Sequence, residues 1–250
     1  ARRGGREAGA ARLRVRGLRR RGALEDISFE VRAGEIVGIA GLVGAGRTEL
    51  CRALFGVDRV EAGEVEVDGE AVRARSPRAA ARAGLALAPE DRQRAGLAAG
   101  RPVGENILLA SLERVSPWGW IRPRRAAEAA EGMMARLRIR AESPAQPAGR
   151  LSGGNQQKAV IAKWALRGAK VYLFDEPTRG IDIGAKAEVF AVMEELARKG
   201  AAVVMVSSEL AELAEMADRI LVMRGGRIVA ELPGGAAPEE MLRHAALEAV

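Results

Sequence analysis

The pattern of hydrophobic and polar positions predicts strands at the start of the chain. Apolar and polar residues alternate in "RLRVRG" (Arg12–Gly17) and in "DISFEV" (Asp26–Val31), as in half-buried strands. The apolar run in "EIVGIAG" (Glu35–Gly41) is typical of a central strand. A hairpin is expected over Gly63–Arg73, because an Asp-Gly pair lies between its two β-rich arms.

A helical segment follows these strands. "SPRAAARAG" (Ser76–Gly84) has a serine before Pro77 and a glycine at its end, so it predicts a capped helix that leads into a strand at Leu85–Ala88. From about residue 90 to 167 helix formers dominate, with apolar periodicity in Val103–Leu112 and Arg124–Leu137. This stretch predicts an inserted helical subdomain.

Strands and helices alternate again after residue 170. The predicted elements are a strand at Val171–Glu176, a helix at Ala185–Arg198, and strands at Ala201–Ser207 and Asp218–Met223. Such alternation favours an α/β fold in which helices flank a mostly parallel sheet, here with an antiparallel β portion at the N-terminus.

Composition supports a folded domain whose charge is unevenly spread. The 250 residues are 48% hydrophobic and 29% charged, with a net charge of +7. Nine arginines and one glutamate give residues 1–24 a net +8, which leaves −1 for the remainder. The near-neutral body argues against a nucleic-acid partner, although Trp118 and Trp120 lie among arginines.

Other features suggest a cytosolic fragment of a longer protein. The chain shows no apolar run of membrane-spanning length and begins without methionine. Residues 1–11 are expected to be a basic linker, residues 12–235 one domain, and residues 236–250 a helical tail. Cys51 cannot form an internal disulfide and is interpreted as a packing residue.

The first chemical motif is "GLVGAGRT", Gly41–Thr48, directly after the central strand. Its glycines allow backbone N–H groups to turn around phosphate oxygens, and Thr48 offers a hydroxyl to Mg²⁺. Arg47, however, stands where the phosphate-loop pattern has lysine. A tight turn without a ligand is the alternative interpretation.

Two acidic residues form the second motif. Asp175 ends an apolar strand and is placed to hold magnesium, while Glu176 is a candidate to accept a proton from attacking water. Because the glycine loop and Asp175 would contact the same metal ion, we expect them to follow adjacent strands.

The third motif is "LSGGNQQK", Leu151–Lys158, which opens an amphipathic helix. Ser152 and the N–H groups of Gly153 and Gly154 suit a terminal phosphate. Because the chain already has a phosphate loop for its own nucleotide, this second phosphate-binding helix start is expected to face the nucleotide of a partner.

Together the three motifs resemble an ATP-binding cassette domain over nearly the whole chain. "PEDRQRAGL" (Pro89–Leu97), "DEPTRGIDIGAK" (Asp175–Lys186) and "VSSEL" (Val206–Leu210) are similar to the second cassette of tandem ATP-binding subunits in bacterial ribose, galactose and xylose importers. The resemblance implies a P-loop fold, ATP and Mg²⁺ as ligands, and a site on the cytoplasmic face of the membrane. The implied partners are a first cassette of the same polypeptide or another cassette copy, permease subunits and, indirectly, a sugar-binding protein.

The resemblance also assigns roles to individual residues. Glu176, Ser208 and Glu90 take catalytic positions, and Thr48, Asp175 and Glu90 take positions at the metal. Nucleotide contacts are implied for Gly41, Gly44, Ala45, Gly46, Arg47, Thr48, Glu49, Ser152, Gly153, Gly154, Asn155, Gln156 and Asp182. Asp182 is also interpreted as a helix N-cap.

Three of these positions depart from the family pattern. Arg47 replaces the loop lysine, Glu90 replaces the Q-loop glutamine, and Ser208 replaces the switch histidine. Arginine is planar and longer than lysine, so it cannot reproduce the compact ammonium contact to phosphates. We therefore expect a weak or slow intrinsic site beside a signature that completes a competent site on a partner. The alternatives are a regulatory half that does not hydrolyse ATP, and a soluble cassette ATPase of translation or DNA repair.

Overall fold

The computed structural model describes residues 9–72, 76–116 and 119–246, which divide into two compact units. The first comprises the described parts of residues 1–87, together with 170–177 and 193–246, and the second comprises 88–169 and 178–192. Parts of three expectations lie outside the described residues: most of the basic linker (1–8), the end of the hairpin (Arg73) and the end of the tail (247–250). Trp118 lies outside them as well.

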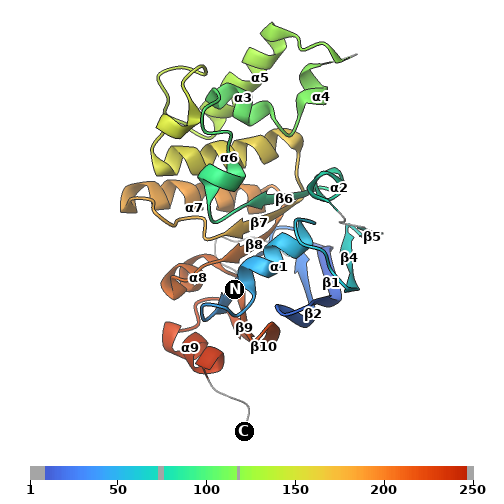
Figure 1. Cartoon of the computed structure of the whole chain (residues 1–250). Helices are drawn as coiled ribbons and strands as arrows, with labels where there is room; N and C mark the ends of the chain where they lie inside the picture. Colours follow the sequence, from blue (N-terminus) through green and yellow to red (C-terminus); the bar gives the residue numbers. More distant parts are fainter. Residues whose placement is uncertain (1–8, 73–75, 117–118, 247–250) are drawn as a thin grey trace. The chain divides into compact units, whose positions relative to one another are not determined.

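The first unit contains two sheets (Figure 1). An antiparallel sheet has the order β2-β1-β4-β5. A six-stranded sheet has the order β10-β9-β3-β8-β7-β6, in which β3 runs parallel to β8 and β9, and β7 runs parallel to β8. The α/β fold with a mostly parallel sheet is thus confirmed. The strands are β1 (Ala11–Arg20), β2 (Leu24–Arg32), β3 (Ile36–Gly41), β4 (Ala62–Val67), β5 (Glu70–Ala71), β6 (Leu85–Ala88), β7 (Val171–Asp175), β8 (Ala202–Val206), β9 (Arg219–Arg224) and β10 (Arg227–Pro233).

Local sequence explains several of these elements. All residues of β3 from Ile36 to Ala40 are buried, as expected of a central strand. Asp68 and Gly69, the turn of the predicted hairpin, both have positive φ, as a two-residue type I′ turn requires. The hydroxyl of Ser76 accepts a hydrogen bond from the amide of Ala79 and so caps α2.

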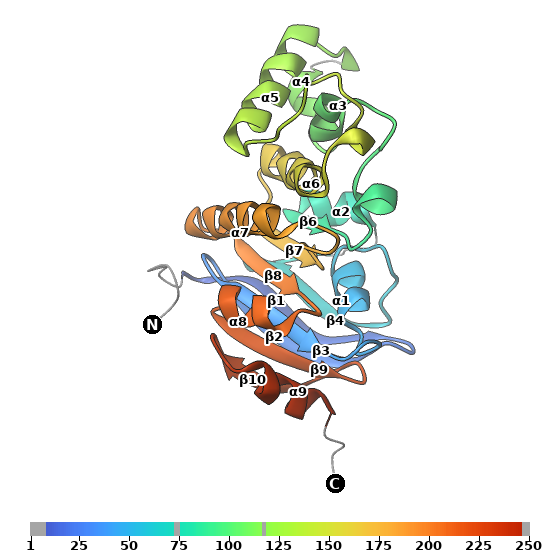
Figure 2. The same ribbon diagram turned by 90° about the vertical axis from the view of Figure 1, so that its left-hand side faces the viewer.

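Among the described residues, the helices that lie entirely in the first unit are α1 (Arg47–Leu54), α2 (Pro77–Arg82), α8 (Leu210–Met216) and α9 (Pro238–Ala246). Helix α1 contacts β3 and β7, and its Ala53 lines a groove together with Leu18 of β1 and Val65 of β4. Helix α8 packs on β3, and α9 packs on β3 and β9 (Figure 2).

The second unit is mainly helical. Helices α3 (Val103–Leu108), α5 (Pro123–Arg136) and α6 (Gly153–Arg167) contact one another. Shorter elements are the π-helix η2 (Arg92–Gly96), α4 (Leu112–Val115) and the 3₁₀ turn η4 (Ala148–Arg150). Helix α7 (Ile183–Arg198) continues across the division, since residues 178–192 cluster with the second unit and 193–198 with the first.

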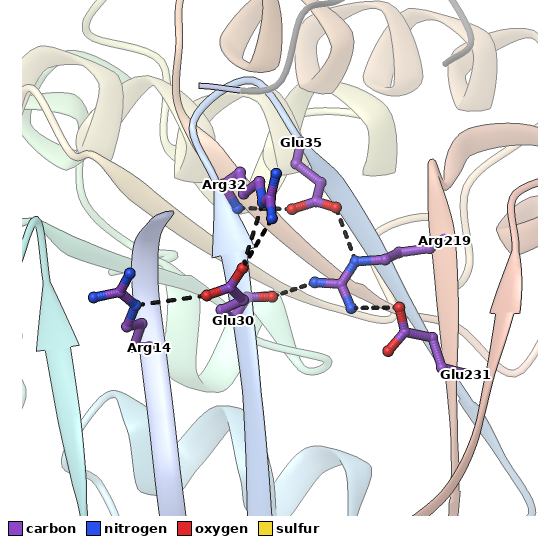
Figure 3. Close-up of polar contacts among 6 residues, drawn as sticks. All are labelled: Arg14, Glu30, Arg32, Glu35, Arg219 and Glu231. Atoms are coloured by element: carbon purple, nitrogen blue, oxygen red, sulfur yellow. Dashed lines mark hydrogen bonds and ion pairs between the residues drawn. The ribbon is translucent and has the colours of Figure 1, made fainter. Parts of the chain in front are cut away.

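A polar cluster around the buried carboxylate of Glu35 joins the two sheets of the first unit. Arg219 of β9 donates through Nε to Glu35 Oε1 at 2.8 Å, through Nη1 to Glu231 Oε1 at 3.1 Å, and through Nη2 to the carbonyl of Glu30 in β2. Glu35 also accepts from the amide of Arg32 at 2.7 Å. Figure 3 shows this cluster, which consists of Arg14, Glu30, Arg32, Glu35, Arg219 and Glu231.

Replacing the two carboxylates that flank Arg219 should have unequal effects on stability. The side chain of Glu35 is 3% exposed, whereas that of Glu231 is 59% exposed. Glu35→Ala leaves a largely buried guanidinium without its main counter-charge and should lower the free energy of unfolding by about 2–4 kcal/mol. Glu231→Ala removes a solvent-screened pair and should cost about 0–1 kcal/mol. Urea unfolding of both variants measures the difference, and equal losses would contradict this account of the cluster.

Candidate functional site

The glycine loop Gly41–Thr48 joins β3 to α1 in the first unit. Gly46 is the N-cap of α1 with φ 98°, and a Cβ atom there would lie 2.6 Å from the carbonyl oxygen of Ala23, so only glycine fits. The first N–H groups of a helix have no partner within the helix, and its positive end favours anions. The opening of α1 at Arg47 is therefore suited to phosphate. The amide of Ala45, by contrast, donates to the carbonyl of Leu42.

Thr48 and Asp175 lie together, as the proposed metal site requires. The hydroxyl of Thr48 donates to Asp175 Oδ1 at 3.1 Å. The expectation of adjacent strands is wrong, however, because β8 lies between β3 and β7. Thr48 still reaches Asp175 because it lies in the first turn of α1, and α1 contacts both β3 and β7.

The chemistry of this pair fits magnesium. Hydroxyl and carboxylate oxygens are ligands that Mg²⁺ prefers, and proteins commonly supply only one or two of them beside phosphates and water. Across the described residues, no group of three or more His, Cys, Asp or Glu side chains is placed to hold a metal by itself. Burial raises the pKa of Asp175 to about 6; the hydrogen bond from Thr48 opposes this rise, and the charge of Glu176 adds to it.

The guanidinium of Arg47 is engaged inside the protein. The side chain is about 10% exposed, and its Nη1 donates to the carbonyl of Ser207 at 2.8 Å. Its Nη2 lies 3.8 Å from Glu176 Oε1. The residue that replaces the loop lysine thus contacts the end of β8 and the candidate base.

Glu176 is held by several groups at once. It follows β7 with φ 50°, a left-handed conformation that is unusual for a residue with a side chain, and its amide donates to Val206. Its Oε2 accepts from both the amide and the hydroxyl of Ser208, each at 3.0 Å. Two hydrogen bonds therefore fix Oε2, while Oε1 faces the guanidinium of Arg47. Ser208, at the expected histidine position, therefore orients Glu176.

The segment Leu151–Lys158, here called the signature segment, lies in the second unit. Ser152 is the N-cap of α6, yet its side chain makes no capping hydrogen bond. Its Oγ accepts from Asn155 Nδ2 at 2.9 Å, and Asn155 Oδ1 in turn accepts from the amide of Arg140. A hydroxyl that accepts one hydrogen bond keeps its own proton to donate. The exposed Ser152 can therefore donate to a phosphate oxygen.

The end of the signature segment is anchored in the interior. Gln156 is 2% exposed, and its Nε2 donates to the carbonyls of Gly149 and Leu151. Its side chain thus supports the segment from the interior. Lys158 is 1% exposed and pairs with Glu188 of α7 at 2.7 Å.

Two further expected residues also lie in the second unit. Asp182 Oδ1 accepts from the amide of Ala185, so Asp182 acts as an N-cap of α7, as one of its two interpretations holds. Glu90 forms an ion pair with Arg179. The position next to Asp182 is occupied by Ile183, which is 87% exposed.

Sequence reasoning missed the partners of Arg47 and the role of Arg92. Arg92 contacts residues 156, 179 and 180, all more than sixty positions away in the chain. The signal available was the motif "PEDRQRAGL", in which sequence reasoning assigned roles to Glu90 but none to Arg92.

Cys51 is fully buried. Burial, with the nearby charge of Asp175, raises the pKa of its thiol well above the usual value. The thiol is therefore unreactive, consistent with a packing role.

Comparison with known proteins gives one family. A family model described as "ABC transporter" matches residues 24–179. The ribose import ATP-binding protein RbsA 1 of Rubrobacter xylanophilus is 51% identical over 235 residues, which are 94% of this chain and 47% of that protein. RbsA of Bacillus subtilis is 47% identical over 222 residues, 89% of this chain and 45% of that protein. The chain thus spans about half the length of these relatives.

Solved structures share the fold. A nucleotide-free ATP-binding cassette from an ABC transporter superposes with a TM-score of 0.78 at 22% identity, with 94% of each chain covered. CbiO1 of Clostridium perfringens, part of the ABC transporter complex cbiONQ, gives a TM-score of 0.74 at 18% identity, over 96% of this chain and 93% of that chain.

No helix among the described residues has the length and hydrophobicity needed to cross a membrane.

Asp175→Asn should stabilise the protein in a pH-dependent way. The folded-state pKa of about 6 lies above the usual aspartate pKa of 3.8, so the stability contributed by protonated Asp175 is lost as the pH rises through about 6. Asparagine carries no charge, so its gain over aspartate should be roughly 1 kcal/mol larger at pH 8 than at pH 5. Unfolding at both pH values measures this, with Glu131→Gln on the exposed face of α5 as control. A gain that is independent of pH would contradict burial as the cause.

Proposed function

The chain belongs to the ABC transporter family, and from that premise we propose that it is one ATP-binding cassette of the subunit that powers a sugar importer. The two relatives named above are ribose import ATP-binding proteins, and this chain covers only 47% and 45% of their length. We propose that this additional length supplies another cassette. The further proposed partners are permease subunits and a sugar-binding protein. The proposed location is the cytoplasmic face of the membrane.

Within this subunit, the N-terminal ends of α1 and α6 have different functions. The loop before α1 binds ATP weakly or turns it over slowly, whereas the signature segment before α6 completes the ATP site of the partner cassette. The observation that carries this proposal is the contrast between two side chains. Arg47 is buried against Ser207 and Glu176, while Ser152 is exposed with its hydroxyl proton free to donate.

The residues at the intrinsic site fit Mg-ATP. Thr48 and Asp175 would hold magnesium, which neutralises negative charge on the phosphates when it is bound. Arg47 is held by a hydrogen bond to the carbonyl of Ser207 and by an ion pair with Glu176. Moving its guanidinium to a phosphate would cost the buried hydrogen bond, which supports a slow site.

Ser152→Ala in the full-length subunit should nearly abolish ATP hydrolysis. Removal of one well-placed donor to developing charge commonly costs roughly 10²- to 10³-fold in kcat. Arg47→Ala should lower turnover much less, because the intrinsic site contributes little. Steady-state phosphate release measures both, and Arg52→Ala, on the same helix as Arg47, is the control. An Arg47→Ala loss as large as that of Ser152→Ala would reject this division of duties.

A second candidate is a cassette whose intrinsic site never hydrolyses ATP. The contacts of Glu176 with Arg47 and Ser208 favour it, because they tie Oε2 of the carboxylate to Ser208 and place Oε1 beside a cation. In a subunit whose partner site is inactivated, Glu176→Gln should remove any residual turnover, since a positioned base contributes about 10²- to 10⁴-fold. Residual turnover that is unchanged in Glu176→Gln would support the non-hydrolysing cassette instead.

A further inference from the structure

The guanidinium of Arg92 joins three separate segments of the second unit. Its Nη1 donates to the carbonyl of Arg179 at 2.7 Å, its Nη2 to the carbonyl of Gly180 at 3.3 Å, and its Nε to Gln156 Oε1 at 3.4 Å. Arg92 begins η2, two residues after Glu90, whose carboxylate pairs with the side chain of Arg179. The segment 90–92 therefore holds residue 179 by both its main chain and its side chain.

Arg92 also lies directly against the signature segment. A Cβ atom on Gly153 would be 2.8 Å from Arg92 Nη2 and 2.9 Å from the carbonyl oxygen of Gly180. Such distances leave no room for a side chain, so Gly153 is required by its neighbours in the same unit. The contact places Arg92, Gly153 and Gly180 in one close-packed group.

Gln156 extends this group to Ser152. Its Oε1 accepts from Arg92 and from Gln93, and its Nε2 donates to the carbonyl of Leu151, the residue before Ser152. A displacement of the guanidinium would therefore disturb the amide that holds the start of the signature segment. On the other side, Gly180 is two residues from Asp182, which caps α7.

The partial burial of the Arg92 guanidinium is energetically unfavourable, which suggests that its contacts have a function. Burial lowers the pKa of Arg92, although the nearby charge of Asp91 opposes the shift. The guanidinium nevertheless bonds to neutral carbonyl and amide oxygens. Two residues on, Arg94 is 90% exposed and pairs only weakly with Asp91, at 3.7 Å.

We propose that Arg92 is a positioning residue for the ATP site that the signature segment completes on the partner cassette. Arg92 fixes Ser152 relative to the segment 179–182, so that both approach the partner's nucleotide as one rigid group. The inference rests on the proposed function, because it requires that Ser152 contacts a partner's phosphate. It adds a residue that touches no nucleotide and acts through Gln156 and Gly180.

The test compares Arg92→Gln with Arg94→Gln in the full-length subunit. Misplacement of a reacting group by about 1 Å can cost roughly 10²-fold in rate. We therefore expect Arg92→Gln to lower kcat for ATP about 10- to 100-fold with little change in KM. Arg94→Gln removes the same charge from the same turn and should leave both unchanged. Arg92→Lys, which keeps the charge but not the fork geometry, should restore part of kcat.

A second readout is independent of hydrolysis. Amide hydrogen exchange in residues 153–156 and 179–182 should become faster in Arg92→Gln and stay unchanged in Arg94→Gln. This measurement and the milder Arg92→Lys variant keep the inference testable even if Arg92→Gln folds poorly.

Two failures can be told apart. If Ser152→Ala abolishes hydrolysis while Arg92→Gln keeps the kcat and the exchange rates of the parent, the positioning role is wrong and the proposed function stands. If Ser152→Ala leaves hydrolysis intact, the proposed function fails, and with it the partner site on which this inference depends. Equal kcat losses in Arg92→Gln and Arg94→Gln would also overturn the inference.

Discussion

The contact of Arg47 with Glu176 and the carbonyl of Ser207 decides what the phosphate loop can do. A guanidinium in a largely buried position needs partners, and here its partners are the candidate base and the end of β8. A shorter ammonium group would not span these same contacts with its single nitrogen, whereas arginine offers several donors in a fixed plane. The loop keeps its glycine geometry and its Thr48–Asp175 pair, which are the features that suit a nucleotide with magnesium.

The opening of α6 shows the opposite balance. Ser152 leaves its own cap position unbonded, and Asn155 orients its hydroxyl from behind. Buried side chains, Gln156 and Lys158, secure the rest of the helix start. At the start of α1 the charged side chain of Arg47 is buried, whereas at the start of α6 the hydroxyl of Ser152 is exposed. This difference supports the proposal that the cassette contributes to the ATP site of a partner more than to its own.

Elements set by local chemistry were predictable from the sequence, and contacts between distant segments were not. The central strand, the Asp68-Gly69 hairpin and the Ser76-capped helix follow from nearby residues, and the structure contains all three. Strand β10 was missed because it is a half-exposed edge strand with weak alternation. The insertion of β8 between β3 and β7 depends on the order of strands in the sheet, which periodicity does not encode. The same holds for Arg92, whose three partners come from two other segments of the chain.

The most direct test is the structure of the ATP-bound full-length subunit assembled with its permease. The account predicts that Ser152 Oγ lies within about 3 Å of a γ-phosphate oxygen, as a hydrogen bond requires, and that this ATP is held by the phosphate loop of another cassette. A nucleotide-bound assembly in which Ser152 faces solvent, or in which its nearest γ-phosphate belongs to the loop Gly41–Thr48 of the same cassette, would contradict it.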